Sequence, residues 1–168
     1  MTSSLRRTAT LALVIPALAL AACGSDDKAS TTATTTAAAP AGLAQAALAT
    51  KANAICKAAN DKAKTVDLPQ AADGAAAAAT YFDALAAIAA DQQQALAALT
   101  PANTVKVKWA AFLALNQEAT DTVQDLPAAI RSSQAKAKVL TDKVGTLSTK
   151  INVAADALGA TTCGSKAG

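Results

Sequence analysis

Apolar residues recur at spacings of three and four along the chain from about residue 42, which is the periodicity of amphipathic helices. Runs of β-branched or aromatic residues with alternating polarity, which indicate strands, are missing from the same region. We therefore expect an all-α domain over residues 42–168. Four helical segments joined by short loops predict an antiparallel four-helix bundle with up-down-up-down connections.

Prolines divide the first three predicted helices. The first is expected over residues 43–64 and the second from residue 71 or 74 to residue 99, with Pro69 between them, since the residue before a proline avoids helical geometry. Thr100 and Pro101 are typical of a cap and a first turn, so a third helix should start there and end near Asp125, before Pro127. The inward residues predicted for these helices are Leu48, Ile55, Ala58, Ala59, Tyr81, Leu85, Ile88, Leu96, Leu99, Val105, Trp109, Phe112, Leu113 and Val123.

The fourth predicted helix has the most regular pattern. Its apolar or small positions alternate steps of three and four over four heptads, and Gly159 follows where a carboxyl-terminal cap belongs. Two other arrangements share this pattern, a three-helix bundle with a frayed first helix and a helical pair that dimerises through the fourth. The residues of this seam are Ile130, Ser133, Ala137, Leu140, Val144, Leu147, Ile151, Ala154 and Leu158.

The amino-terminal region has a different pattern. Residues 1–7 are polar and basic, and residues 8–22 are apolar and uncharged. An apolar stretch of about 15 residues is too short for a permanent membrane-spanning helix, which needs about 20. The order predicts a signal peptide over residues 1–22. Without the rest of a twin-arginine motif, we expect Arg6 and Arg7 to supply only positive charge.

The residues Leu20-Ala21-Ala22-Cys23 close this stretch and resemble the lipobox of bacterial lipoprotein precursors. The resemblance implies that the Cys23 thiol receives a diacylglyceryl group, with palmitate as a typical acyl chain, and that the chain is cut before it. The mature protein would then be anchored on the extracytoplasmic face of a bacterial membrane, because two or more acyl chains suffice for stable attachment. Ordinary signal cleavage at Ala19-Leu20-Ala21 is the alternative and would release a soluble protein.

Residues 23–41 contain no large apolar side chain and are rich in Thr and Ala. Such a segment cannot offset the entropy of ordering, so we expect a disordered tether between the anchor and the bundle. Removing Arg6 and Arg7 lowers the formal net charge from +3 to +1. This small charge and the scarcity of aromatic residues argue against nucleic acid as a partner.

Two cysteines remain beyond the anchor, Cys56 in the first predicted helix and Cys163 after the fourth. An even pair in an exported chain predicts a disulfide bond. Because Cys56 lies about 13 residues inside the helix, either that helix begins nearer Thr50 or residues 160–163 fold back along it. A first-helix cysteine followed by a terminal Gly-x-x-x-Cys, here Gly159 to Cys163, resembles small alanine-rich lipoproteins of high-GC bacteria, a group without an assigned activity.

The inventory of reactive residues argues against an enzyme. The chain has no histidine and a single glutamate, Glu118, which removes histidine-based triads and metal sites. Asp121 and Asp125 are one helical turn apart, and we expect them to be solvated rather than catalytic. The scattered glycines form no phosphate-binding loop. We therefore predict no catalytic residue, no metal and no cofactor.

Two kinds of function remain. One is a membrane-tethered bundle that binds an envelope protein or an apolar ligand, and the other is a passive envelope spacer that self-associates along the fourth helix. Alanines between the helices could leave room for a guest, or they could let the helices close tightly. The aromatic residues fit a ligand box or, as we expect, the core. The residues in question are Ala78, Ala86, Ala89 and Ala110, and Tyr81, Phe82, Trp109 and Phe112.

Overall fold

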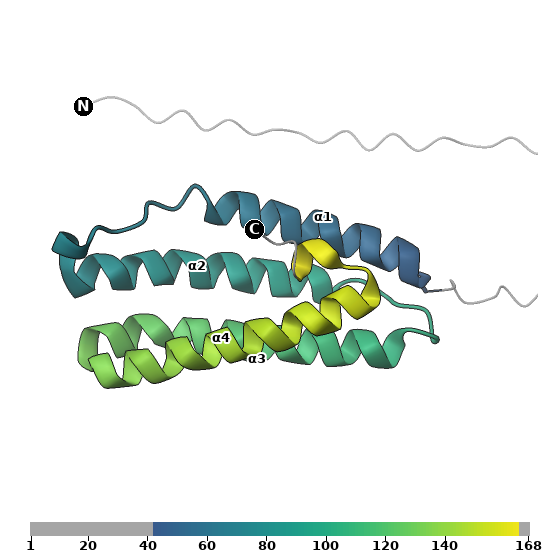
Figure 1. Cartoon of the computed structure of the whole chain (residues 1–168). Coiled ribbons are helices and arrows are strands. Elements are labelled where there is room, and N and C mark those ends of the chain that lie inside the picture. The colour runs from purple at the N-terminus through teal and green to yellow at the C-terminus, as the bar shows by residue number, and fades with distance from the viewer. Residues whose placement is uncertain (1–41, 165–168) are drawn as a thin grey trace, which may run out of the picture. The chain divides into compact units, whose positions relative to one another are not determined.

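The computed structural model describes residues 42–164, which form four antiparallel α-helices (Figure 1). They are α1 (Gln45–Ala63), α2 (Gly74–Ala97), α3 (Lys106–Ser132) and α4 (Gln134–Leu158), with two short 3₁₀ helices, η1 (Ala71–Asp73) and η2 (Thr161–Cys163). The predicted all-α four-helix bundle is confirmed. The predicted signal peptide, Cys23 and the tether lie outside the described residues.

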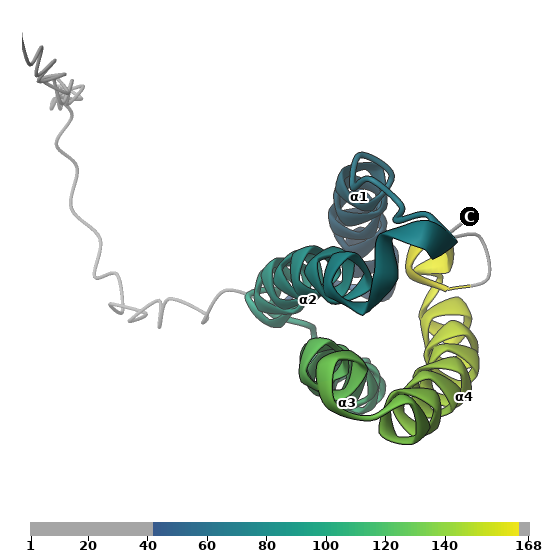
Figure 2. The ribbon, with the colours of Figure 1, turned by 90° about the vertical axis from the view of Figure 1, so that its left-hand side faces the viewer.

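The helices form an arc rather than a fully closed ring. α1 packs on α2, α2 on α3 and α3 on α4, while η2 contacts both α1 and α4. Figure 2 looks along the helices and shows α1 and α4 as the two ends of the arc, with η2 between them. The bundle is therefore closed mainly by the segment that follows α4.

The close-packed core lies at the end of the bundle where η2 sits. Trp109 and Phe112 of α3 are almost fully buried, with ring centroids 5.1 Å apart, and both are core residues as predicted. Side chains of the other three helices surround them, namely Leu48, Ala52, Cys56, Leu96, Ala155 and Leu158. Ala58, which was also predicted to face inward, is exposed.

The boundary between the third and fourth helices differs from the prediction. α3 continues through Pro127 to Ser132, although proline lacks the backbone donor that a helix interior uses. Leu126, Pro127 and Ala129 are buried, so tertiary packing outweighs the helix-breaking tendency. The chain turns at Ser133, whose hydroxyl accepts a hydrogen bond from the Lys136 backbone N–H as the N-cap of α4.

This boundary corrects the seam of the fourth helix. Ile130 belongs to α3, and Ser133 caps α4 instead of lying along it. The remaining seam is internal, since Leu147 and Leu158 are buried. Gly159 has φ 80° and ends α4 as predicted, because glycine adopts this left-handed conformation without steric cost. The seam packs within the chain, as a single bundle requires.

The residues Thr100 and Pro101 do not start a helix, contrary to the prediction. α3 begins at Lys106, and the preceding segment pairs with the start of the bundle in an extended conformation. Leu43 N–H donates to the Thr100 carbonyl and Ala102 N–H donates to the Leu43 carbonyl, both at 2.8 Å. These bonds satisfy backbone groups that no helix uses.

Candidate functional site

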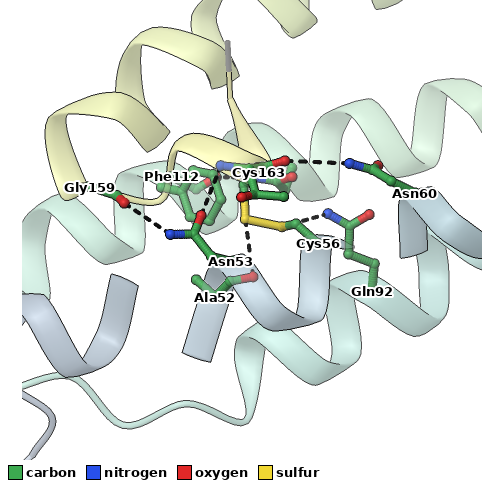
Figure 3. Close-up of a disulfide and its surroundings, with 10 residues drawn as sticks. Ala52, Asn53, Cys56, Asn60, Gln92, Phe112, Gly159 and Cys163 are labelled. Atoms are coloured by element: carbon green, nitrogen blue, oxygen red, sulfur yellow. Dashed lines mark hydrogen bonds between the residues drawn. A yellow bond between two sulfur atoms is a disulfide. The ribbon is translucent and has the colours of Figure 1, made fainter. Parts of the chain in front are cut away.

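The predicted disulfide bond between Cys56 and Cys163 is present, with the two Cα atoms 5.1 Å apart (Figure 3). α1 begins at Gln45, so its start is not displaced toward Thr50. Instead the chain reverses at Gly159 and η2 lies against α1. The bond therefore forms by the fold-back of residues 160–163, the second of the two routes that the sequence left open.

Two asparagines of α1 hold the same segment (Figure 3). Asn53 Nδ2 donates to the Gly159 carbonyl at 3.2 Å, and Asn53 Oδ1 accepts from the Thr162 N–H at 2.8 Å. Asn60 Nδ2 donates to the Thr162 carbonyl at 3.4 Å. We call the disulfide with Asn53 and Asn60 the clamp. Sequence reasoning missed the asparagines, although their positions three before and four after Cys56 place them on its helix face.

At the other end of the bundle from the core, all four helices border an apolar groove of about 280 Å³. Alanines of α1 and α2 occupy positions where larger side chains would fill the space. The lining contains no charged side chain. Its residues are Ala59, Asn60, Ala63, Phe82, Leu85, Ile88, Ala89, Gln92, Val123, Leu126, Thr141 and Val144.

The three polar residues of the lining each donate a hydrogen bond within the protein. Asn60 donates to the clamp segment, as described above. Gln92 Nε2 donates to Cys56 Sγ at 3.2 Å, and Thr141 Oγ1 donates to the Ala137 carbonyl at 2.9 Å. Because nine of the twelve lining residues are apolar, the groove interior favours a guest that brings no polar group of its own.

The four alanines that the sequence predicted as possible cavity-forming residues have different environments in the structure. Ala89 lines the groove. Ala86 is buried, Ala78 is half-buried and Ala110 is exposed, and none of these three is part of the lining. Phe82 also lines the groove, which corrects its expected assignment to the core. The groove shows that the alanine-rich helices do not close tightly at this end of the bundle.

Charged residues lie beside the groove rather than in it. Lys57 forms a salt bridge with Asp61 on α1, and Lys138 forms one with Asp142 on α4, with a distance of 2.7 Å between Nζ and Oδ2. The Lys57 hydrogen bond, with the positive charges of Lys57 and Lys64, lowers the pKa of the exposed Asp61 carboxyl. These groups are solvated, so they leave the apolar character of the interior unchanged.

The other candidate chemistry lies on the surface. Asp121 and Asp125 are exposed, and Asp121 Oδ1 accepts a hydrogen bond from Gln117 Nε2 at 2.7 Å. Within residues 42–164, no three Cys, Asp or Glu side chains group as a metal site. None of the helices in this range combines the length and the apolar character needed to cross a bilayer.

No protein-family model, curated protein or solved structure matches the chain.

Proposed function

We propose that this protein is a lipid-anchored component of the bacterial cell envelope whose groove binds the alkyl chain of an apolar ligand. The observation that carries the proposal is the apolar groove bordered by all four helices, without a charged residue in its lining. Ligand sites are typically concave and mostly apolar, with a few polar groups. The groove's volume of about 280 Å³ is at the small end of such sites.

The size of the groove suits one short alkyl chain. A water molecule occupies roughly 30 Å³ of the liquid and a methylene group is about as large, so the groove corresponds to roughly nine carbons. Burying a methylene contributes about 0.8 kcal/mol, which gives a gross gain of about 7 kcal/mol. Association costs at least about 4 kcal/mol of that. About 3 kcal/mol remains, so we expect weak, reversible binding in the millimolar range.

The proposed anchor places the groove where such ligands are abundant. Leu20-Ala21-Ala22-Cys23 resembles a lipobox, so the bundle would be held close to a membrane whose lipids carry alkyl chains. Binding a chain in this way requires no catalytic group, in keeping with the absence of histidine.

A bulky residue in the groove should prevent this binding. Full-length protein in phosphatidylcholine nanodiscs is exposed to decanol that carries a photoreactive diazirine on its chain, and labelled peptides are measured by mass spectrometry. Ala89→Phe should weaken labelling of the lining by at least about tenfold. Displacing only two methylenes of the ligand from the groove already lowers the affinity by that factor. Ala110→Phe adds the same side chain at an exposed position and should label like the unmodified protein.

Thermal unfolding of both variants establishes that they remain folded. Equal labelling of the two variants would contradict binding in the groove. Failure of the unmodified protein to label there would favour the spacer function instead.

A further inference from the structure

Lysines adjoin the groove along two rims, which we define as the exposed faces of α1 and α4 beside its lining. On α1, Lys57 comes three residues before the lining residue Asn60, and Lys64, the C-cap of the helix, comes four residues after it. On α4, Lys138 comes three residues before the lining residue Thr141. Residues three or four apart are neighbours on a helix surface, so each lysine adjoins the groove. We call Lys57, Lys64 and Lys138 the rim lysines.

The rim lysines outnumber the carboxylates beside them. Lys57 pairs with Asp61 and Lys138 pairs with Asp142, each within its own helix, whereas Lys64 forms no salt bridge within residues 42–164. Pairs of this type contribute only about 0.3–0.5 kcal/mol at exposed positions. All three ammonium groups can therefore turn toward an anion at the groove with little loss.

On the far side of the groove, α2 contains no lysine or arginine. This helix contributes five of the lining residues, and its charged side chains are Asp83 and Asp91. These carboxylates pair on the outside of the bundle with Arg131 of α3 and Lys62 of α1. An anionic group on a ligand is therefore favoured at the rims, and the lining itself has no charge to attract it.

We propose that the ligand of the groove is an anionic amphiphile, with its alkyl chain in the groove and its carboxylate or phosphate head group at the rim lysines. This inference rests on the proposed alkyl-chain binding and adds the class of head group. Lys64 is the principal contact, since it is the rim lysine that forms no salt bridge within residues 42–164. A neutral head group gains nothing from the rims, and a cationic one is repelled.

The test compares ligands that share a chain and differ in head group. Full-length protein in phosphatidylcholine nanodiscs is labelled with photoreactive decanoate, decyl phosphate, decanol and decyltrimethylammonium. The triple variant Lys57→Gln, Lys64→Gln, Lys138→Gln should need at least about fivefold more decanoate or decyl phosphate for half-maximal labelling of the groove. Its decanol curve should not change. A given ligand partitions into the nanodiscs to the same extent whichever protein variant they carry. A difference in labelling between two variants with the same ligand therefore reports the effect of the rim lysines.

A matched control removes the same charge elsewhere. Lys51→Gln, Lys106→Gln, Lys150→Gln changes three exposed lysines that do not adjoin the lining, and it should retain the decanoate curve of the unmodified protein.

Equal weakening in both triple variants, or none in the rim variant, would overturn the anionic inference. Decanol labelling would still support the groove in either case. If none of the four ligands labels the groove, the proposed function itself fails.

Discussion

Asn53 joins α1 to the carboxyl-terminal segment through both ends of its amide. It donates to the Gly159 carbonyl and accepts from the Thr162 N–H, across more than one hundred residues of sequence. Asn53→Ala leaves the part-buried Thr162 N–H without this acceptor, so we expect a loss of about 1–3 kcal/mol in the free energy of unfolding, measured with urea. Asn53→Asp keeps the acceptor and should lose less. An unchanged urea midpoint in the alanine variant would show that these bonds contribute nothing.

Single residues also show how far the sequence could predict the site. The spacing of Trp109 and Phe112 predicts burial, and both rings are buried, because large apolar side chains gain most from leaving water. Alanine carries no comparable signal. Ala89 lines the groove and Ala110 is exposed, yet the energy of either position in a helix is nearly the same. Which alanines border a space depends on how the helices diverge, and this is a property of the assembled bundle.

At the scale of helices, the disulfide should control how firmly α1 is held. α1 packs on α2, and it reaches α4 mainly through η2, which contains Cys163. A bond across 107 residues stabilises by roughly 4–5 kcal/mol in the chain-entropy model. Reduction should therefore lower the free energy of unfolding, and it should speed amide hydrogen exchange in α1 more than in α2 and α3. Mild denaturant is needed during reduction because both cysteines are buried.

The control for this prediction is Cys56→Ser, Cys163→Ser, whose exchange should not respond to reductant. Uniformly faster exchange across all four helices in the reduced protein would contradict a local role for the clamp.

Helix existence was predicted more reliably than helix boundaries, and Pro127 shows why. Local geometry predicts a break there, but the buried Leu126 and Ala129 keep α3 continuous, since their packing is a tertiary effect. Thr100 and Pro101 likewise have the local signature of a helix start, but their backbone pairs with Leu43 instead. In both places the deciding partner is distant in sequence, so no local pattern could reveal it.

Across the whole bundle, side-chain size is distributed unevenly between the two ends. The end with the disulfide contains Trp109, Phe112 and most of the closely packed leucines, whereas the opposite end contains the groove. This arrangement lets one end stabilise the fold while the other retains space. The clamp joins the two, because Asn60 both lines the groove and donates to the segment that contains Cys163.

The proposed position of this bundle at a membrane depends on Cys23, which lies outside the described residues. One acyl chain binds a membrane only marginally and two or more hold stably, so lipidation at a single cysteine would decide whether the protein stays at the membrane. In a bacterial host that processes lipoproteins, Cys23→Ala should abolish incorporation of an alkyne-tagged palmitate and leave uncleaved precursor or released protein. Cys163→Ala removes a cysteine that the lipobox resemblance does not involve, so it should retain the label. A Cys23→Ala protein that remains labelled, processed and membrane-bound would refute the anchor, and ligand binding by the groove would then have to be explained for a protein free of the membrane.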